Sequence, residues 1–399
     1  MTRQRSHVGD LRGATRLAAD ATRAVTDLVE EMHIAIGAGP AVLGRPLENA
    51  IRRLASPVYA TIRTVSGVVG AGVDMALEQL ASVLGESTPR PEHEAVLAAI
   101  NGVLGDYLGA TDNPLAIEMQ FRRGGRALTP EQGALAEALA QVGGKLLVLV
   151  HGSCMNDLQW CRNGHDHGAA LARDLGYTPV YLHYNSGLHI SSNGKAMAAL
   201  LEQLTSAWPV VLEELVIVGH SMGGLVSRSA CHYADVAGHD WRSRLHALVC
   251  LGSPHHGAPL ERGGNWVEVL LGVSRYSAPL ARLGRIRSAG VTDMRFGNVL
   301  DEDWQGRDRF AFGDDCRSPL PLPRGVRCYA VAATTALEPM SKLPSDGLVQ
   351  VDSALGRCAR PELSLDFPAD HQLVSFGTTH LDLLDRPQVY AALASWLDS

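Results

Sequence analysis

From residue 145 onward, short apolar runs alternate with helical segments, and this alternation constrains the fold of the 399-residue chain more than any other feature. The run at 146–150, Leu-Leu-Val-Leu-Val, is apolar at every position rather than at every second one. Such strands are buried on both faces, as in a parallel sheet covered by helices on both sides. The predicted strands are 145–150, 178–183, 212–218, 245–251, 327–333 and 372–376, and the predicted helices are about 166–175, 193–206, 221–235 and 386–397. We therefore expect an α/β fold with a mostly parallel sheet and helices on both faces.

The alternation is interrupted between about residues 258 and 326. Two short amphipathic helices are expected there, at 266–271 and 280–285, followed by a stretch rich in Asp, Gly and Arg. Ligands bind at the carboxyl ends of parallel strands, so the loops 151–161, 219–224 and 252–257 should converge. The interrupting segment is then predicted to be a helical cap insertion over the sheet.

Residues 1–140 have the composition and periodicity of helices. Apolar residues recur at steps of three and four from Leu11 to Met32, which predicts a helix over about 10–36. Further helices are expected near 41–55, 56–84 and 92–109. The chain thus divides into an N-terminal all-helical region, 1–140, and an α/β domain, 141–399. Because the apolar stripe is rich in alanine, it needs a neighbour, and we expect self-association of these helices or docking on the α/β domain.

The charge balance argues against nucleic acid as a partner, since 35 Lys and Arg residues face 42 Asp and Glu residues, for a formal net charge of −7. No uncharged apolar stretch is long enough for a transmembrane segment. The N-terminus has basic residues but lacks the apolar segment of a secretory signal. The seven cysteines include no CxxC pair, which disfavours a disulfide framework or a zinc ribbon. The expected location is cytoplasmic.

The segment Gly219-His-Ser-Met-Gly-Gly224 has the G-x-S-x-G pattern, and it lies directly after a predicted strand and before a predicted helix. In that setting the turn strains the serine backbone, and the glycines let the neighbouring backbone pass closely. The helix N-terminus stabilises negative charge that develops nearby. Ser221 is therefore the predicted nucleophile, and the alternative is a plain N-cap serine.

Acyl transfer also requires backbone donors for the oxyanion. One is predicted to be the amide of Met222, the residue after the nucleophile. The second should come from the loop after the first of the apolar strands, Val150-His-Gly-Ser-Cys154. The amide of Ser153 is the best candidate for this donor, and that of Cys154 is the alternative. The non-catalytic interpretation of the segment is an ordinary strand-to-loop turn. The residues predicted to line the substrate pocket are His151, Cys154, Asp157 and Trp160.

A serine nucleophile needs a base, and the base needs an orienting acid. His380 follows the last predicted strand and precedes the terminal helix, where the base belongs if the order along the chain is Ser, Asp, His. Asp346 begins an Asp-Gly turn suited to aiming a carboxylate, so it is the predicted acid, with Asp352 as the alternative. Asp382 lies two residues after His380 and is expected to hold either a loop or an ion.

Five segments together resemble the α/β-hydrolase family of bacterial lipases and esterases, including proteins similar to GPI-inositol deacylases. They are VHG at 150–152, GHSMGG at 219–224, LGSPHHGAPL at 251–260, SDGLVQVDSALG at 345–356 and THLDLLDRPQVY at 379–390. The resemblance implies an α/β-hydrolase fold, a catalytic triad of Ser221, Asp346 and His380, and a cap over 258–326. In some related lipases the residue matching Asp382 binds calcium. The second calcium carboxylate has no clear match here, so no metal is predicted.

Together these features predict a serine hydrolase that cleaves carboxylic esters through an acyl-enzyme intermediate and needs no cofactor. The expected partner is a small-molecule or lipid-like ester substrate. Two alternatives are an acyltransferase with the same triad and a catalytically inactive scaffold whose helical arm is the functional part. Because the triad and both oxyanion donors lie beyond residue 141, a chain starting near Gln141 is expected to hydrolyse short soluble esters.

Overall fold

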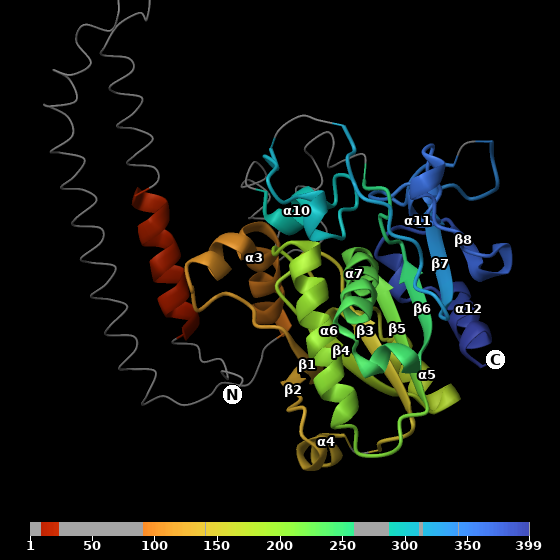
Figure 1. Cartoon of the computed structure of the whole chain (residues 1–399), viewed down its shortest axis with the longest axis horizontal. Coiled ribbons are helices and arrows are strands. Elements are labelled where there is room, and N and C mark those ends of the chain that lie inside the picture. The colour runs from red at the N-terminus through yellow and green to blue at the C-terminus, as the bar shows by residue number, and fades with distance from the viewer. Residues whose placement is uncertain are drawn as a thin grey trace, which may run out of the picture. The chain divides into compact units, whose positions relative to one another are not determined.

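The computed structural model describes residues 9–23, 91–139, 141–258, 287–310, 314–341 and 343–398. The helices predicted near 41–55, 56–84, 266–271 and 280–285 lie outside these residues. The chain divides into two compact units, one of Met1–Thr88 with Ala110–Ala116 and the other of Pro89–Gly109 with Ile117–Ser399. In the first unit, residues 9–23 form an α-helix, which confirms that part of the helix predicted over 10–36 (Figure 1).

In the second unit, eight strands among the described residues form one sheet in the order β2-β1-β4-β3-β5-β6-β7-β8. The strands are β1 (Gln120–Arg123), β2 (Arg126–Ala127), β3 (Lys145–Val150), β4 (Thr178–His183), β5 (Glu214–His220), β6 (Leu245–Leu251), β7 (Arg327–Thr334) and β8 (Gln372–Phe376). From β4 to β8 all neighbouring strands are parallel, whereas β1 pairs with β4 and β2 in the antiparallel sense. The predicted mostly parallel sheet is confirmed.

Helices cover both faces of the sheet, as its apolar strands predict (Figure 1). The helices are α3 (Pro91–Ala110), α4 (Gln132–Ala138), α5 (His167–Leu175), α6 (Ile190–Ser206), α7 (Met222–Ala237), α10 (Ala289–Asp293), α11 (Val351–Ala354) and α12 (Pro387–Leu397). Side chains of α3, α6 and α7 pack with Leu146 and Val148 of β3 in one apolar cluster. Side chains of α5 and α12 pack with Leu147 and Leu149 in a second cluster on the opposite face.

The structure differs from the expectation of helices throughout residues 1–140, because β1 and β2 lie in this stretch and extend the sheet. β1 has the sequence Gln-Phe-Arg-Arg, with Phe121 as its single apolar residue. A four-residue strand of mostly polar residues carries no apolar periodicity that would reveal it. It forms because it adds to the edge of β4, where Phe121 pairs with Leu182. The compact unit that contains the sheet therefore begins well before residue 141.

The segment between β6 and β7, where a cap is predicted, holds the short helix α10 and a 3₁₀ turn over Asp301–Asp303 in its described part. Across the described parts of the chain, none of the helices combines the length and apolar character that crossing a bilayer requires.

Candidate active site

Ser221 occupies a strained turn between β5 and α7. Its φ of 54° and ψ of −123° lie in a region that side-chain-bearing residues rarely adopt, as expected for a nucleophile at a strand-to-helix turn. The amide of Ser221 donates to the carbonyl of Leu251 over 2.8 Å, which ties the turn to the end of β6. Ser221 is 2% exposed, and its Oγ makes no hydrogen bond with a described residue. Among the described residues, none competes with a ligand for a hydrogen bond to this hydroxyl.

The glycines around the serine permit the close backbone contacts on which the turn depends. A Cβ at Gly219 would lie 2.5 Å from the amide nitrogen of Gly224, and one at Gly223 would lie 2.1 Å from the carbonyl oxygen of Val150. Both distances are shorter than any side chain tolerates. The packing thus agrees with the prediction from sequence that glycines are needed here to let the neighbouring backbone pass closely.

His380 and Asp346 form a buried pair on the loops after β8 and β7. The distance from His380 Nδ1 to Asp346 Oδ2 is 2.7 Å, and the residues are 3% and 2% exposed. The other carboxylate oxygen accepts hydrogen bonds from the amides of Leu348 at 2.9 Å and Val349 at 2.7 Å. A carboxylate can only accept, so the proton in this contact is on Nδ1 of the imidazole, and in the neutral ring Nε2 is then the nitrogen with the lone pair.

The alternative acid, Asp352, has a different environment. Its side chain is 73% exposed and lies 3.6 Å from Arg357. A surface ion pair of this kind orients nothing in the site. The pairing with His380 therefore separates the two carboxylates that the sequence left as rivals.

His380 lies beside the serine turn. A Cβ at Gly252, the residue after Leu251, would lie 3.1 Å from Cε1 and 3.2 Å from Nδ1 of the His380 ring. His220, the neighbour of Ser221, has its Nε2 3.1 Å from the carbonyl oxygen of His380, and the two rings are 4.9 Å apart. Burial, with a further contribution from His380, holds the pKa of His220 well below its ordinary value, so its ring is neutral. The serine turn after β5, the loop after β6 and the loop that carries His380 thus meet at one edge of the sheet.

The loop after β3, residues 151–160, is called here the β3 loop. A Cβ at Gly152 would lie 3.0 Å from Cβ of Ser221, so this loop runs directly against the serine turn. The amide of Cys154 donates to Ser186 Oγ over 3.0 Å. The amide of Ser153 makes no hydrogen bond to a described residue, and that of Met222 is in the first helical turn, where no intrahelical acceptor exists. Of the two candidates in the β3 loop, only the Ser153 amide is thus available to a ligand.

The residues predicted to line the pocket are buried in the protein. His151 is fully buried with its ring stacked on Tyr184 at 4.3 Å, and burial lowers its pKa to about 3. Trp160 is fully buried in the apolar cluster under α5 and α12. Burial raises the pKa of Cys154 to about 11, which keeps its thiol neutral. These side chains support the β3 loop from within, because their apolar and aromatic surfaces pack into the core.

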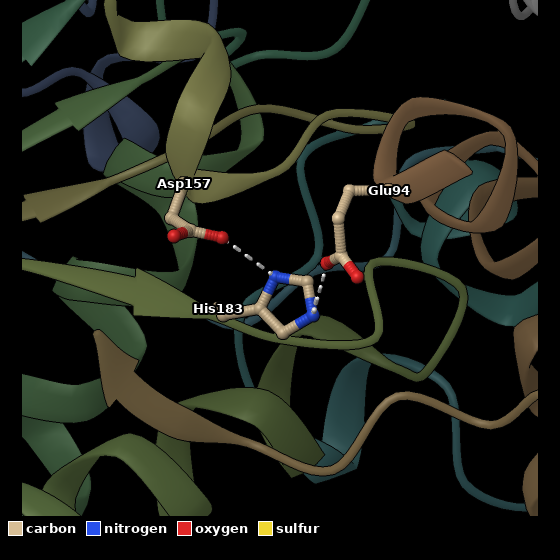
Figure 2. A group of neighbouring side chains, drawn as sticks. All are labelled: Glu94, Asp157 and His183. Carbon is tan, nitrogen blue, oxygen red and sulfur yellow. Dashed lines mark ion pairs between the residues drawn. The ribbon is translucent and has the colours of Figure 1, made fainter. Parts of the chain in front are cut away.

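Asp157 belongs to a buried cluster with Glu94 of α3 and His183 of β4, shown in Figure 2. His183 lies with Nδ1 3.1 Å from Asp157 Oδ1 and Nε2 3.9 Å from Glu94 Oε2. These are metal-binding residue types. However, Nη1 of Arg122 lies 2.8 Å from the same Glu94 oxygen and 3.2 Å from the same Asp157 oxygen. The guanidinium of Arg122 supplies the cation, so the cluster is a buried ion network.

Sequence reasoning missed Glu94 and Arg122, since both lie outside every recognised motif. For Asp382, the structure shows the loop-holding contacts that were one of its two expected roles. Its carboxylate accepts from the amide of Thr379 at 3.0 Å and pairs with Arg162 at 3.2 Å. These contacts fix the start of the loop that carries His380.

Comparison with known proteins gives a family match to part of the chain and several solved structures that are similar at low identity. Residues 141–312 match the family described as PGAP1-like alpha/beta domain. No curated protein matches the sequence. The mature Bacillus licheniformis lipase BlEst2 is similar in structure at 15% identity, with 71% of this chain and 98% of that chain covered and a TM-score of 0.43. The Staphylococcus hyicus lipase is similar at 11% identity, with 64% and 96% covered and a TM-score of 0.35. The partial family match and the mostly parallel eight-stranded sheet agree in giving the described part of the chain an α/β fold.

Proposed function

We propose that this protein is a serine hydrolase that cleaves carboxylic esters, with Ser221 as nucleophile, His380 as base and Asp346 as the acid that orients the base. The observation that carries the proposal is the buried His380–Asp346 pair, 2.7 Å long, beside the strained serine turn. A strained backbone and a buried charge both cost stability, and they recur together where catalysis uses them.

In the first half of the reaction, Ser221 Oγ attacks the ester carbonyl carbon and its proton passes to Nε2 of His380. Asp346 stabilises the imidazolium through the proton on Nδ1. The negative charge on the carbonyl oxygen is held by the amides of Ser153 and Met222. When the tetrahedral intermediate collapses, the bond to the alkoxide leaving group breaks and His380 returns the proton to it.

In the second half, water replaces the alcohol. His380 takes a proton from the water as its oxygen attacks the acyl-enzyme, and the same two amides hold the second oxyanion. The intermediate then releases the carboxylic acid, and Ser221 recovers its proton from His380.

The proposal is tested by active-site titration with a fluorophosphonate, together with turnover of p-nitrophenyl esters. We expect one equivalent of probe on Ser221 and a parallel loss of ester hydrolysis. Added alcohol should divert the acyl-enzyme to a new ester. Ester hydrolysis that persists in fully labelled protein, or labelling confined to another serine, would show that the site is misassigned.

The two carboxylates should respond very differently to amide substitution. Asp346→Asn should lower kcat by about 10⁴-fold, because an amide favours the wrong imidazole tautomer. The matched variant Asp352→Asn should change kcat by less than about twofold, because its ion pair with Arg357 is on the surface. Steady-state kinetics on both proteins, at equal thermal stability, measures the difference. A larger loss in Asp352→Asn would reverse the assignment of the acid.

The close approach of the β3 loop to Ser221 should make Gly152 intolerant of a side chain. In Gly152→Ala, the new methyl would lie 3.0 Å from Cβ of Ser221, which displaces the Ser153 amide from the oxyanion. We expect kcat/KM to fall by about 10²-fold, as when one oxyanion donor is lost. Gly133→Ala is the control, since nothing lies within 4 Å of its added methyl. Equal activity of the two variants would argue against this loop as the oxyanion donor.

A further inference from the structure

We propose that α3 and β1 position the β3 loop for catalysis, with Glu94 and Arg122 acting through Asp157 and Gly102 acting through Cys154. These elements precede residues 141–312, which match the family. The inference rests on the proposed function, since it assigns positioning residues to the same site.

The first attachment is electrostatic. The side chains of Arg122, Glu94 and Asp157 are 6%, 5% and 2% exposed, and one guanidinium nitrogen contacts both carboxylates. A carboxylate buried this deeply requires a nearby cation or hydrogen-bond donors. Asp157 is therefore held by Arg122 together with His183, whose Nδ1 lies 3.1 Å from the same carboxylate oxygen. Arg122 is itself tied to the sheet, because it pairs with Tyr181 in the β1–β4 ladder.

The second attachment is steric. A Cβ at Gly102 of α3 would lie 2.2 Å from Sγ and 2.9 Å from Cα of Cys154. Cys154 has a positive φ of 60°, and its amide is bonded to Ser186 Oγ. The backbone of α3 at Gly102 is thus in direct contact with Cys154, the residue of the β3 loop that has a positive φ.

These contacts enclose the proposed oxyanion donor. Gly152, on one side of Ser153, lies against Ser221, and Cys154, on the other side, lies against Gly102. The Ser153 amide cannot shift without moving one of these contacts. An error of about 1 Å in the position of a catalytic group costs on the order of 10²-fold in rate. The position of α3 therefore sets the accuracy of the oxyanion site.

The ionic character of these contacts bears on how precisely they hold the β3 loop. A buried ion network contributes little net stability compared with apolar packing, but it is strict about geometry. Here both carboxylates reach the same guanidinium nitrogen, Nη1 of Arg122, which fixes the position of Asp157 relative to Glu94. An apolar contact at Asp157 would allow the β3 loop to slide.

The test compares two alanine variants on one helix. Gly102→Ala should lower kcat by about 10- to 100-fold with KM within about twofold, and the rate of fluorophosphonate labelling should fall in parallel, because both reactions need the oxyanion donors. Gly109→Ala gains the same helix propensity, and its methyl would meet only Leu188 Cδ2 at 3.5 Å, so its kinetics should match the wild type. A folded Gly102→Ala protein with wild-type kcat would overturn the proposal.

The ionic attachment is tested without adding volume. Glu94→Gln and Asp157→Asn should each lower kcat, and the double variant should lose less than the product of the single losses, because both act on the same loop. A purely structural role would lower the melting temperature of both proteins and leave kcat of the folded fraction unchanged.

Failure of the proposed function is distinguishable from failure of this inference. If the wild type neither hydrolyses esters nor reacts with a fluorophosphonate, the proposed function fails. The rate of amide hydrogen exchange over residues 151–160 then still tests whether α3 and β1 hold the β3 loop in place. Exchange should be faster in Gly102→Ala and in Glu94→Gln than in Gly109→Ala, and equal exchange in all three would overturn it.

Discussion

Replacing Ser221 with alanine should abolish ester hydrolysis while the protein remains folded. Loss of a nucleophile from a triad lowers kcat by at least about 10³-fold and by up to about 10⁶-fold, with residual turnover from the oxyanion donors and binding. The fold should be unaffected, because the removed oxygen makes no hydrogen bond with a described residue. Alanine keeps the same positive φ, so the strain of the turn is unchanged. Initial rates with a short p-nitrophenyl ester and a thermal melt measure the two effects.

Ser253→Ala is the matched control for this experiment. Ser253 is also buried on a loop at the same edge of the sheet, and its Oγ likewise has no hydrogen-bond partner in the described chain. Its activity should stay within about threefold of the wild type. Activity above about a tenth of the wild type in folded Ser221→Ala protein would refute the nucleophile assignment.

A chain shortened to start at Gln141 should fail to give soluble folded protein, whereas one that starts at Pro89 should fold and hydrolyse short esters. This prediction differs from the one made from sequence, which placed the boundary at 141, because the compact unit that holds the sheet also includes Pro89–Gly109. The shorter chain lacks β1, so β4 becomes an open edge that favours aggregation. It also lacks Arg122, which leaves the buried carboxylate of Asp157 without its cation. Breaking a buried pair costs about 3–5 kcal/mol, a large share of the roughly 5–15 kcal/mol that holds a typical domain folded.

Soluble yield, circular dichroism and sedimentation of the two shortened chains measure this effect, with ester hydrolysis as the functional readout. The full-length chain is the reference for both. A folded, monomeric and active chain from Gln141 onward would show that α3 and β1 are dispensable, and it would also weaken the positioning role proposed for them.

The sequence by itself determined the parallel part of the sheet and the serine turn. In β3, Leu147 and Leu149 pack into one cluster and Leu146 and Val148 into the other, which is why the whole run is apolar. The glycines beside Ser221 are equally local, because each is needed where the backbone of a neighbouring turn passes closely. Local patterns predict such features because their physical causes, burial on two faces and steric access, act on consecutive residues.

Only the tertiary structure distinguished Asp346 from Asp352, since both follow the same strand and one alone reaches His380. Only the tertiary structure brought Glu94 and Arg122 to Asp157. Sequence periodicity does not identify a charged residue that will be buried, because the oppositely charged partners that stabilise it in the interior are distant along the chain. The strand β1 was not predicted from the sequence for the same reason. Four polar-rich residues become a strand when the edge of β4 offers them hydrogen bonds, and that edge exists only once the sheet has formed.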